Sequence, residues 1–121
     1  MNLPSLPFLA GGAFLLLVAA SPPAAPHLSA QPTQAELAKF QGLLFKLGEC
    51  HRIRAVALAR TNASVEQIVS QSLAACEPRV APLLAMMAKY DGAAEARRKL
   101  AGQRGHWRDA IRRNVAAARV H

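Results

Sequence analysis

The sequence predicts an all-α fold: a small helical bundle built on a disulfide-linked antiparallel helical hairpin, followed by a kinked third segment and a basic C-terminal helix. From residue 33 onward the chain is rich in Ala, Leu, Gln and Arg and poor in β-branched and aromatic residues. Its apolar residues recur at steps of three and four and do not alternate as in a strand. Its two cysteines lie at equal distances from a short polar break, as two residues facing each other across a hairpin would.

The first twenty residues are interpreted as a signal peptide. They carry no charged side chain, whereas the rest of the chain holds all 15 basic and all 7 acidic residues. The apolar run from Leu6 to Ala20 has the length of a signal-peptide core and is shorter than the roughly 20 residues that span a bilayer. We expect export to the periplasm or the exterior, with cleavage after Ala20 or, alternatively, after Ala30. Because no Lys or Arg precedes the apolar run, an uncleaved N-terminal anchor or a buried N-terminal helix remains the alternative.

Residues 21–32 are expected to be a flexible linker, and residues 33–121 a single helical domain. The stretch "SPPAAPHLSAQPTQ" has four prolines and no charge, so it can neither continue a helix nor pack a core. The roughly 100 residues that follow cleavage suffice for one domain with one modest core.

The first helix of the domain is expected to begin after Thr33 and to end near Arg60. Thr33 and Glu36 have the spacing of a capping box, in which each side chain bonds the backbone N–H of the other residue. After the polar break, Ser64 and Gln67 repeat this arrangement and predict a second helix from Val65. The face expected to be buried in the first helix comprises Leu37, Phe40, Leu44, Leu47 and Leu58.

The second apolar stripe continues past the second cysteine, where Pro78 and Pro82 must kink or break the helix. This stripe comprises Val65, Ile68, Val69, Leu73, Cys76, Val80, Leu83 and Met87. Asp91 and Gly92 are expected to end the segment. The last helix, residues 93–120, is expected to bury Ala96, Leu100, Trp107, Ile111, Val115 and Ala118, and to kink or split at Gly102 and Gly105.

Cys50 and Cys76 are predicted to form a disulfide. Each lies thirteen positions from residue 63, the centre of the break, so the two reach the same level of an antiparallel hairpin. Closing this loop stabilises the fold by about 3.5 kcal/mol in the chain-entropy model. A redox pair, the first alternative, would need cysteines in C-x-x-C spacing. A metal site, the second, is disfavoured because the neighbours in "ECH" point in directions about 100° apart on a helix.

The stretch Gly48 to Pro78 resembles a group of small exported bacterial proteins of uncharacterised function. The shared features are a cysteine late in one helix, an Ala/Arg-rich run, a polar turn with a Ser-x-x-Gln cap, and a second cysteine in "SLAACEP". The resemblance implies an exported helical domain with a disulfide across its hairpin. It carries no functional residue over to this chain.

Two polar residues, His51 and Arg54, occupy positions where the first helix should present apolar side chains. One interpretation makes them a polar core site, such as a ligand pocket or an anion-binding point between helices. The other is a packed Arg stem and a hydrogen-bonded His in a small core. The candidate partners of Arg54 are Glu49, Glu66 and Glu77.

The last helix carries most of the net charge. Residues 93–121 hold eight basic and two acidic side chains, which supply six of the formal net charge of +8. On a helical wheel, one flank of the stripe containing Trp107 and Ile111 consists of Arg97, Arg108, Arg112 and Arg119. These arginines and Trp107 are the predicted interaction surface, for anionic lipid or for an acidic partner. The alternative places Trp107 in the core and leaves the arginines as a solvated outer face.

The sequence favours a non-enzymatic interaction or structural module. No Ser/His/Asp set, paired carboxylates or open metal site can be assembled from its residues, so we expect no catalytic activity, no cofactor and no metal. The expected partner is an unidentified protein or an anionic envelope surface. A membrane-surface-active protein that binds anionic lipid peripherally is the alternative. Nucleic acid is not expected because no recognition motif is present, and the pattern leaves the oligomeric state open.

Overall fold

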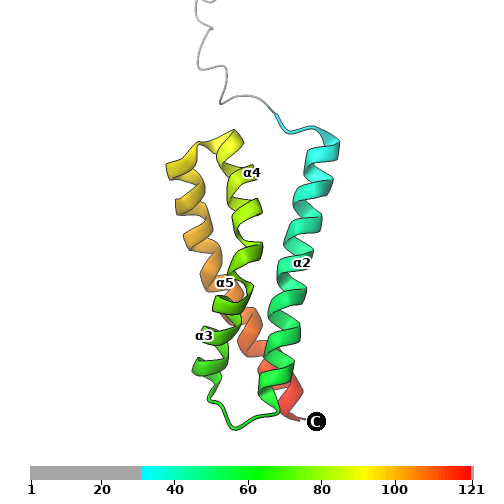
Figure 1. Ribbon diagram of the computed structural model, residues 1–121, viewed down its shortest axis with the longest axis vertical. Helices are drawn as coiled ribbons and strands as arrows, with labels where there is room; N and C mark the ends of the chain where they lie inside the picture. The colour runs from blue at the N-terminus through cyan, green and yellow to red at the C-terminus, as the bar shows by residue number, and fades with distance from the viewer. Residues whose placement is uncertain (1–30, 121) are drawn as a thin grey trace, which may run out of the picture. The chain divides into compact units, whose positions relative to one another are not determined.

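The computed structural model describes residues 31–120, which form four α-helices and one 3-10 turn. They are α2 (Gln34–Ala59), α3 (Val65–Cys76), the 3-10 turn η2 (Glu77–Arg79), α4 (Ala81–Asp91) and α5 (Ala93–Val120). In Figure 1, α2 and α5 run in one direction, while α3 and α4 follow each other in the opposite direction. The predicted all-α hairpin architecture is confirmed. The predicted signal peptide and nearly all of the linker lie outside the described residues.

Both predicted capping boxes are present. The Glu36 backbone N–H donates to Thr33 Oγ1 at 3.1 Å, and the Thr33 N–H donates to Glu36 Oε1 at 3.0 Å. At α3 the equivalent bonds join Ser64 and Gln67, at 3.1 and 2.8 Å. These bonds satisfy backbone donors that have no partner within the first helical turn, so they fix where each helix begins.

The two prolines and one glycine shape the turns between α3, α4 and α5. α3 ends at Cys76, Pro78 lies in the 3-10 turn, and Pro82 lies in the first turn of α4, where a missing N–H costs nothing. The predicted break in the second stripe is therefore confirmed. Gly92, with φ of 87°, ends α4 in a backbone conformation that favours glycine.

The last helix was expected to kink or split at Gly102 and Gly105, just before Trp107, and the split is wrong, because α5 is one continuous helix. Each glycine weakens a helix by about 1 kcal/mol relative to alanine. Packing on both sides of the glycines outweighs that loss: Leu100 precedes them and Ile111 follows them, and both are buried.

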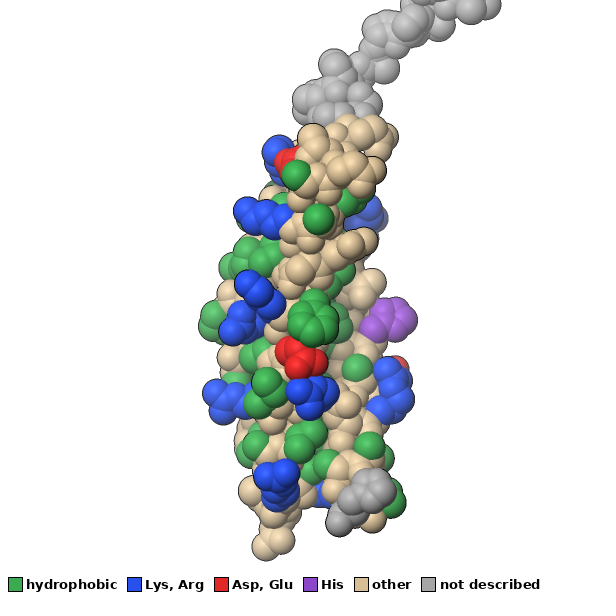
Figure 2. Space-filling model, turned by 90° about the vertical axis from the view of Figure 1, so that its right-hand side faces the viewer, with side chains coloured by type: hydrophobic (Ala, Val, Ile, Leu, Met, Phe, Trp, Pro, Cys, Tyr) green, Lys and Arg blue, Asp and Glu red, His purple; other side chains and the backbone are tan. Residues whose placement is uncertain are grey.

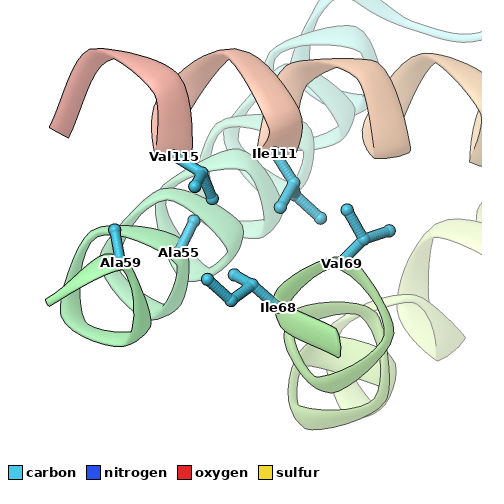
Figure 3. Packing of buried hydrophobic residues seen from close by; sticks show 6 residues of the cluster. All are labelled: Ala55, Ala59, Ile68, Val69, Ile111 and Val115. Atoms are coloured by element: carbon cyan, nitrogen blue, oxygen red, sulfur yellow. The ribbon is translucent and has the colours of Figure 1, made fainter. Parts of the chain in front are cut away.

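The core consists of two clusters stacked along the bundle. Near the loop between α2 and α3, side chains from α2, α3 and α5 point toward one another; they are Ala55, Ala59, Ile68, Val69, Ile111 and Val115 (Figure 3). Toward the other end the buried residues are Leu47, Cys76, Val80, Leu83 and Leu100. None of the helices within residues 31–120 is long and apolar enough to cross a membrane.

The buried stripe of α2 differs from the predicted one. Leu37 and Leu44 are 41% and 40% exposed, although both were expected to be buried. The residues that α2 buries are Leu47, His51, Ala55 and Ala59. Because four residues exceed one helical turn, this stripe rotates by about 40° at each step. At the last two steps the stripe consists of alanines, which are buried in a cluster with side chains of α3 and α5.

Candidate functional site

The Cys50–Cys76 disulfide is present, as predicted. The S–S distance is 2.08 Å and the two Cα atoms lie 5.9 Å apart. Cys76 is fully buried in the core, whereas Cys50 is half-buried. Disulfides of this kind persist in oxidising compartments. Both thiols are consumed in the bond, and within residues 31–120 no group of three or more His, Cys, Asp or Glu side chains could hold a metal ion.

His51 and Arg54 lie in different surroundings. His51 is only 4% exposed, and its ring centroid lies 5.7 Å from that of Trp107. Burial lowers the pKa of His51, and the charge of nearby Glu77 opposes this effect. Arg54 is exposed. The interpretation of Arg54 as a core residue is wrong, because the stripe of α2 continues from His51 to Ala55, and adjacent helical residues diverge by about 100°.

The three carboxylates proposed as partners of Arg54 bind other arginines. Glu49 accepts two bonds from Arg52, at 3.1 and 2.8 Å. Glu77 accepts two from Arg104, and Glu66 accepts two from Arg112. In each case the guanidinium lowers the pKa of the carboxyl group below its usual value.

Two arginines of α5, Arg112 of the predicted basic flank and Arg104 outside it, bind carboxylates of α3 and η2 and so serve the fold. Arg104 reaches Glu77 at 3.1 and 3.0 Å, and Arg112 reaches Glu66 at 3.1 and 3.0 Å. Arg112 also donates to Asp109 on its own helix, at 3.1 Å. These bidentate contacts link α5 to α3 and to η2.

Arg119 holds the loop between α2 and α3. Its Nε donates to the Ala59 carbonyl at 3.0 Å, and its Nη2 donates to the carbonyls of Thr61 and Ala63 at 3.2 and 2.6 Å. The last carbonyls of a helix lack intrahelical partners and attract positive charge. Since α2 has no basic residue in its own last turn, Arg119 supplies that charge from a helix far along the chain.

Trp107 is half-buried and packs against the core cluster that contains Leu47 and Leu100. The Arg104 guanidinium carbon lies 5.8 Å from the Trp107 ring centroid. Of the four arginines predicted to form an interaction surface, Arg97 and Arg108 are exposed and form no salt bridge within the described residues. The predicted surface on α5 therefore divides into two arginines that contact other parts of the chain and two that face solvent.

Every acidic side chain of the protein is engaged in a salt bridge. The pairs are Glu36–Lys89, Glu49–Arg52, Glu66–Arg112, Glu77–Arg104, Asp91–Lys99, Glu95–Arg98 and Asp109–Arg112. The most strongly shifted carboxyl is Glu36, whose pKa falls to about 2 because it accepts hydrogen bonds from Lys89, Tyr90 and the Thr33 backbone.

The basic residues outside these salt bridges are Lys39, Lys46, Arg54, Arg60, Arg79, Arg97, Arg108, Arg113 and Arg119. Arg119 bonds backbone carbonyls, which do not cancel its charge. The formal net charge of +8 is therefore carried by cations that lack a carboxylate partner within residues 31–120.

One side of the molecule combines such cations with exposed apolar side chains. Phe45 and Ile53 on α2 are 70% and 57% exposed. They border a hollow of about 310 Å³, which is lined by Phe45, Lys46, Glu49, Cys50, Ile53 and Arg79. We call these six residues the α2–η2 face. Figure 2 views the molecule from the side of α2, where hydrophobic groups are interspersed with Lys and Arg and acidic groups are few.

The sequence pattern does not single out the α2–η2 face, because Arg79 joins it only through the fold. The sequence feature that could have indicated this face is the pair Phe45 and Ile53. Both fall outside the predicted apolar stripe of the first helix, so they are not expected to be buried in the core. A helix with apolar side chains on two opposite faces has one more apolar face than a monomeric bundle buries.

A second hollow lies between α2, α4 and α5. It has a volume of about 430 Å³, and its apolar wall comprises Phe40, Leu44, Leu83, Met87, Leu100 and Trp107. Lys99, Gln103 and His106 contribute its polar side chains, and Gly102 also lines it. Lys99 is already bound to Asp91 at 3.0 Å, so this groove offers less free charge than the α2–η2 face.

Comparisons with known proteins give no family for this chain: no protein-family model, no curated protein and no solved structure matches it.

Proposed function

We propose that the protein is an exported, non-enzymatic interaction module that binds an anionic partner, either an acidic protein or the envelope surface. The observation that carries this proposal is the complete pairing of its carboxylates. With all seven acidic side chains engaged internally, the surplus cations have no carboxylate partner within residues 31–120. Such a surface attracts anions over a distance set by the ionic strength.

The disulfide and the charge-free N-terminal segment support the exported location. A disulfide forms and persists in an oxidising compartment, and the apolar run ending at Ala20 has the length of a signal-peptide core. The envelope of a cell presents anionic lipids and acidic proteins, which are the chemical complement of this surface.

The arginines of α5 share the binding role with other elements. Arg112 and Arg119 hold the bundle together, so the cations free to bind from α5 are Arg97, Arg108 and Arg113. Lys46 on α2 and Arg79 in η2 add to them on another side of the molecule. The proposed module therefore does not depend on α5 alone.

The test is salt-dependent binding by the disulfide-intact protein. Two anionic probes are used, vesicles containing phosphatidylglycerol and a polyglutamate resin, with phosphatidylcholine vesicles and an uncharged resin as controls. We expect retention on at least one anionic probe at low salt, weakening as salt increases. Failure to bind either anionic probe at low salt would overturn the proposal, as would equal binding to the uncharged controls.

A further inference from the structure

We propose that the α2–η2 face is a docking surface for an anionic lipid bilayer. Lipid phosphates would lie between Lys46 and Arg79, while Phe45 and Ile53 enter the boundary between headgroups and acyl chains. The inference rests on the proposed function: it selects the partner and assigns the surface that binds it.

The apolar part of the face is placed for shallow insertion. Phe45 and Ile53 are the most exposed of the large apolar side chains of α2. They are eight residues apart, so their directions differ by about 80° around the helix axis, and both line the same hollow. Single exposed apolar residues are common on protein surfaces. Here the two border one hollow together with two cations, which is the pattern of an interfacial amphipathic helix.

The cationic part comes from two elements that the fold brings together. Lys46 belongs to α2 and Arg79 to η2, and both line the hollow. Neither forms a salt bridge within residues 31–120. The one carboxylate of the face, Glu49, binds Arg52 at 2.8 Å, so its charge is already neutralised. A phosphate approaching the hollow therefore meets positive charge on both sides.

Charge and packing argue against the other occupants of this face. In a symmetric contact with a second copy, the unpaired cations of one face would oppose those of the other. Insertion through Trp107 is disfavoured because its ring contacts His51 on the buried side of α2. The body of α2, about 10 Å across, separates Trp107 from a surface bound at Phe45.

This separation gives a direct spectroscopic test. Trp107 is the only tryptophan of the chain, so the unmodified protein reports on α5. A Phe45→Trp, Trp107→Phe variant moves the reporter to the α2–η2 face. With phosphatidylglycerol vesicles containing brominated acyl chains, we expect a blue shift and strong quenching at position 45, and neither at position 107. Strong quenching at position 107 with none at position 45 would overturn the proposal.

A second test removes the apolar contacts while keeping the charge. The variant Phe45→Gln, Ile53→Gln should bind anionic vesicles at least tenfold more weakly, because it loses the contact with the bilayer interior. Val120→Gln is the matched control, since it removes a largely exposed apolar side chain from α5. Its binding should change less than twofold. If the double variant binds as tightly as the parent, the α2–η2 face is not inserted.

The outcomes separate this inference from the proposed function. Binding to the polyglutamate resin without binding to anionic vesicles would overturn bilayer docking and leave the interaction module in place. Vesicle binding that the Phe45 and Ile53 substitutions leave unchanged would also overturn the inference alone. Binding to neither probe would overturn both.

Discussion

The guanidinium of Arg119, at the end of α5, donates to the backbone carbonyl of Ala59, the last residue of α2, at 3.0 Å. Two further bonds reach the carbonyls of Thr61 and Ala63 in the following loop. One side chain thus satisfies the end of α2 and holds the turn of the hairpin. Arg119 is a structural residue, although the sequence pattern had suggested a surface role.

Replacing Arg119 by Gln should therefore destabilise the fold. Hydrogen bonds from a charged donor are worth more than neutral ones, but this side chain is partly exposed to solvent, so we expect a loss of about 1–2 kcal/mol in the free energy of unfolding. Denaturant unfolding of the disulfide-intact protein measures it. Arg113 is also exposed and lies on α5, more than one helical turn before Arg119. Arg113→Gln should change stability by less than about 0.5 kcal/mol. Equal effects of the two substitutions would contradict a specific role for Arg119.

The disulfide should contribute a large part of the stability. Reduction, or the double substitution Cys50→Ala and Cys76→Ala, should lower the free energy of unfolding by about 3.5 kcal/mol. The physical reason is the freedom that the unfolded chain regains when a loop with a sequence separation of 26 is opened. Thermal unfolding with and without a reducing agent tests this. An unchanged unfolding temperature after verified reduction would contradict it.

Alanine should stabilise the helices at their internal glycines. A Cβ added at Gly42, Gly48, Gly102 or Gly105 would meet no atom within 4 Å. Each substitution should therefore raise the free energy of unfolding by about 1 kcal/mol, as expected for alanine in a helix interior. Gly92→Ala is the control of opposite sign: its φ of 87° strains a side chain, so stability should fall by about 1–2 kcal/mol. Differential scanning calorimetry can compare all five.

His51 should make stability depend on pH. Burial lowers the pKa of His51 in the folded state, so below the ordinary histidine pKa the unfolded chain binds a proton that the folded chain resists. Stability should be fully present above the ordinary histidine pKa and should fall as the pH decreases below it. His51→Gln should flatten this part of the profile. An identical slope in parent and His51→Gln proteins would show that another group titrates.

Much of the fold could be predicted because its signals are local. The caps at Thr33 and Ser64, the prolines after Cys76 and the glycine at position 92 act on their own neighbours, and each ends or begins a helix where expected. The cysteines added one long-range constraint through their equal distance from the turn.

The errors arose where the outcome depends on packing between helices. A helical wheel with a fixed face placed Arg54 inside, but the real stripe of α2 rotates and buries Ala55. Local propensity suggested a break at Gly102 and Gly105, and packing overrode it. The partner of Arg112 on α3 lies 46 residues away along the chain, and the partners of Arg119 lie 56 to 60 residues away. The wheel could therefore show a basic flank but not these contacts.

The central claim is that the α2–η2 face, and not net charge alone, binds the anionic partner. Two double variants remove the same charge from different sides: Lys46→Gln with Arg79→Gln on the face, and Arg97→Gln with Arg113→Gln on α5. Each lowers the formal net charge of +8 by two. All four side chains lack a carboxylate partner within residues 31–120, so neither variant breaks a salt bridge.

The measurement is the partition coefficient of both variants on phosphatidylglycerol vesicles at a single low salt concentration, determined by co-sedimentation. Near an anionic membrane each Lys or Arg contributes about 1 kcal/mol. We therefore expect the Lys46/Arg79 variant to bind roughly 30-fold more weakly than the parent, and the Arg97/Arg113 variant to lose less than about fivefold. Equal losses in the two variants would contradict the account.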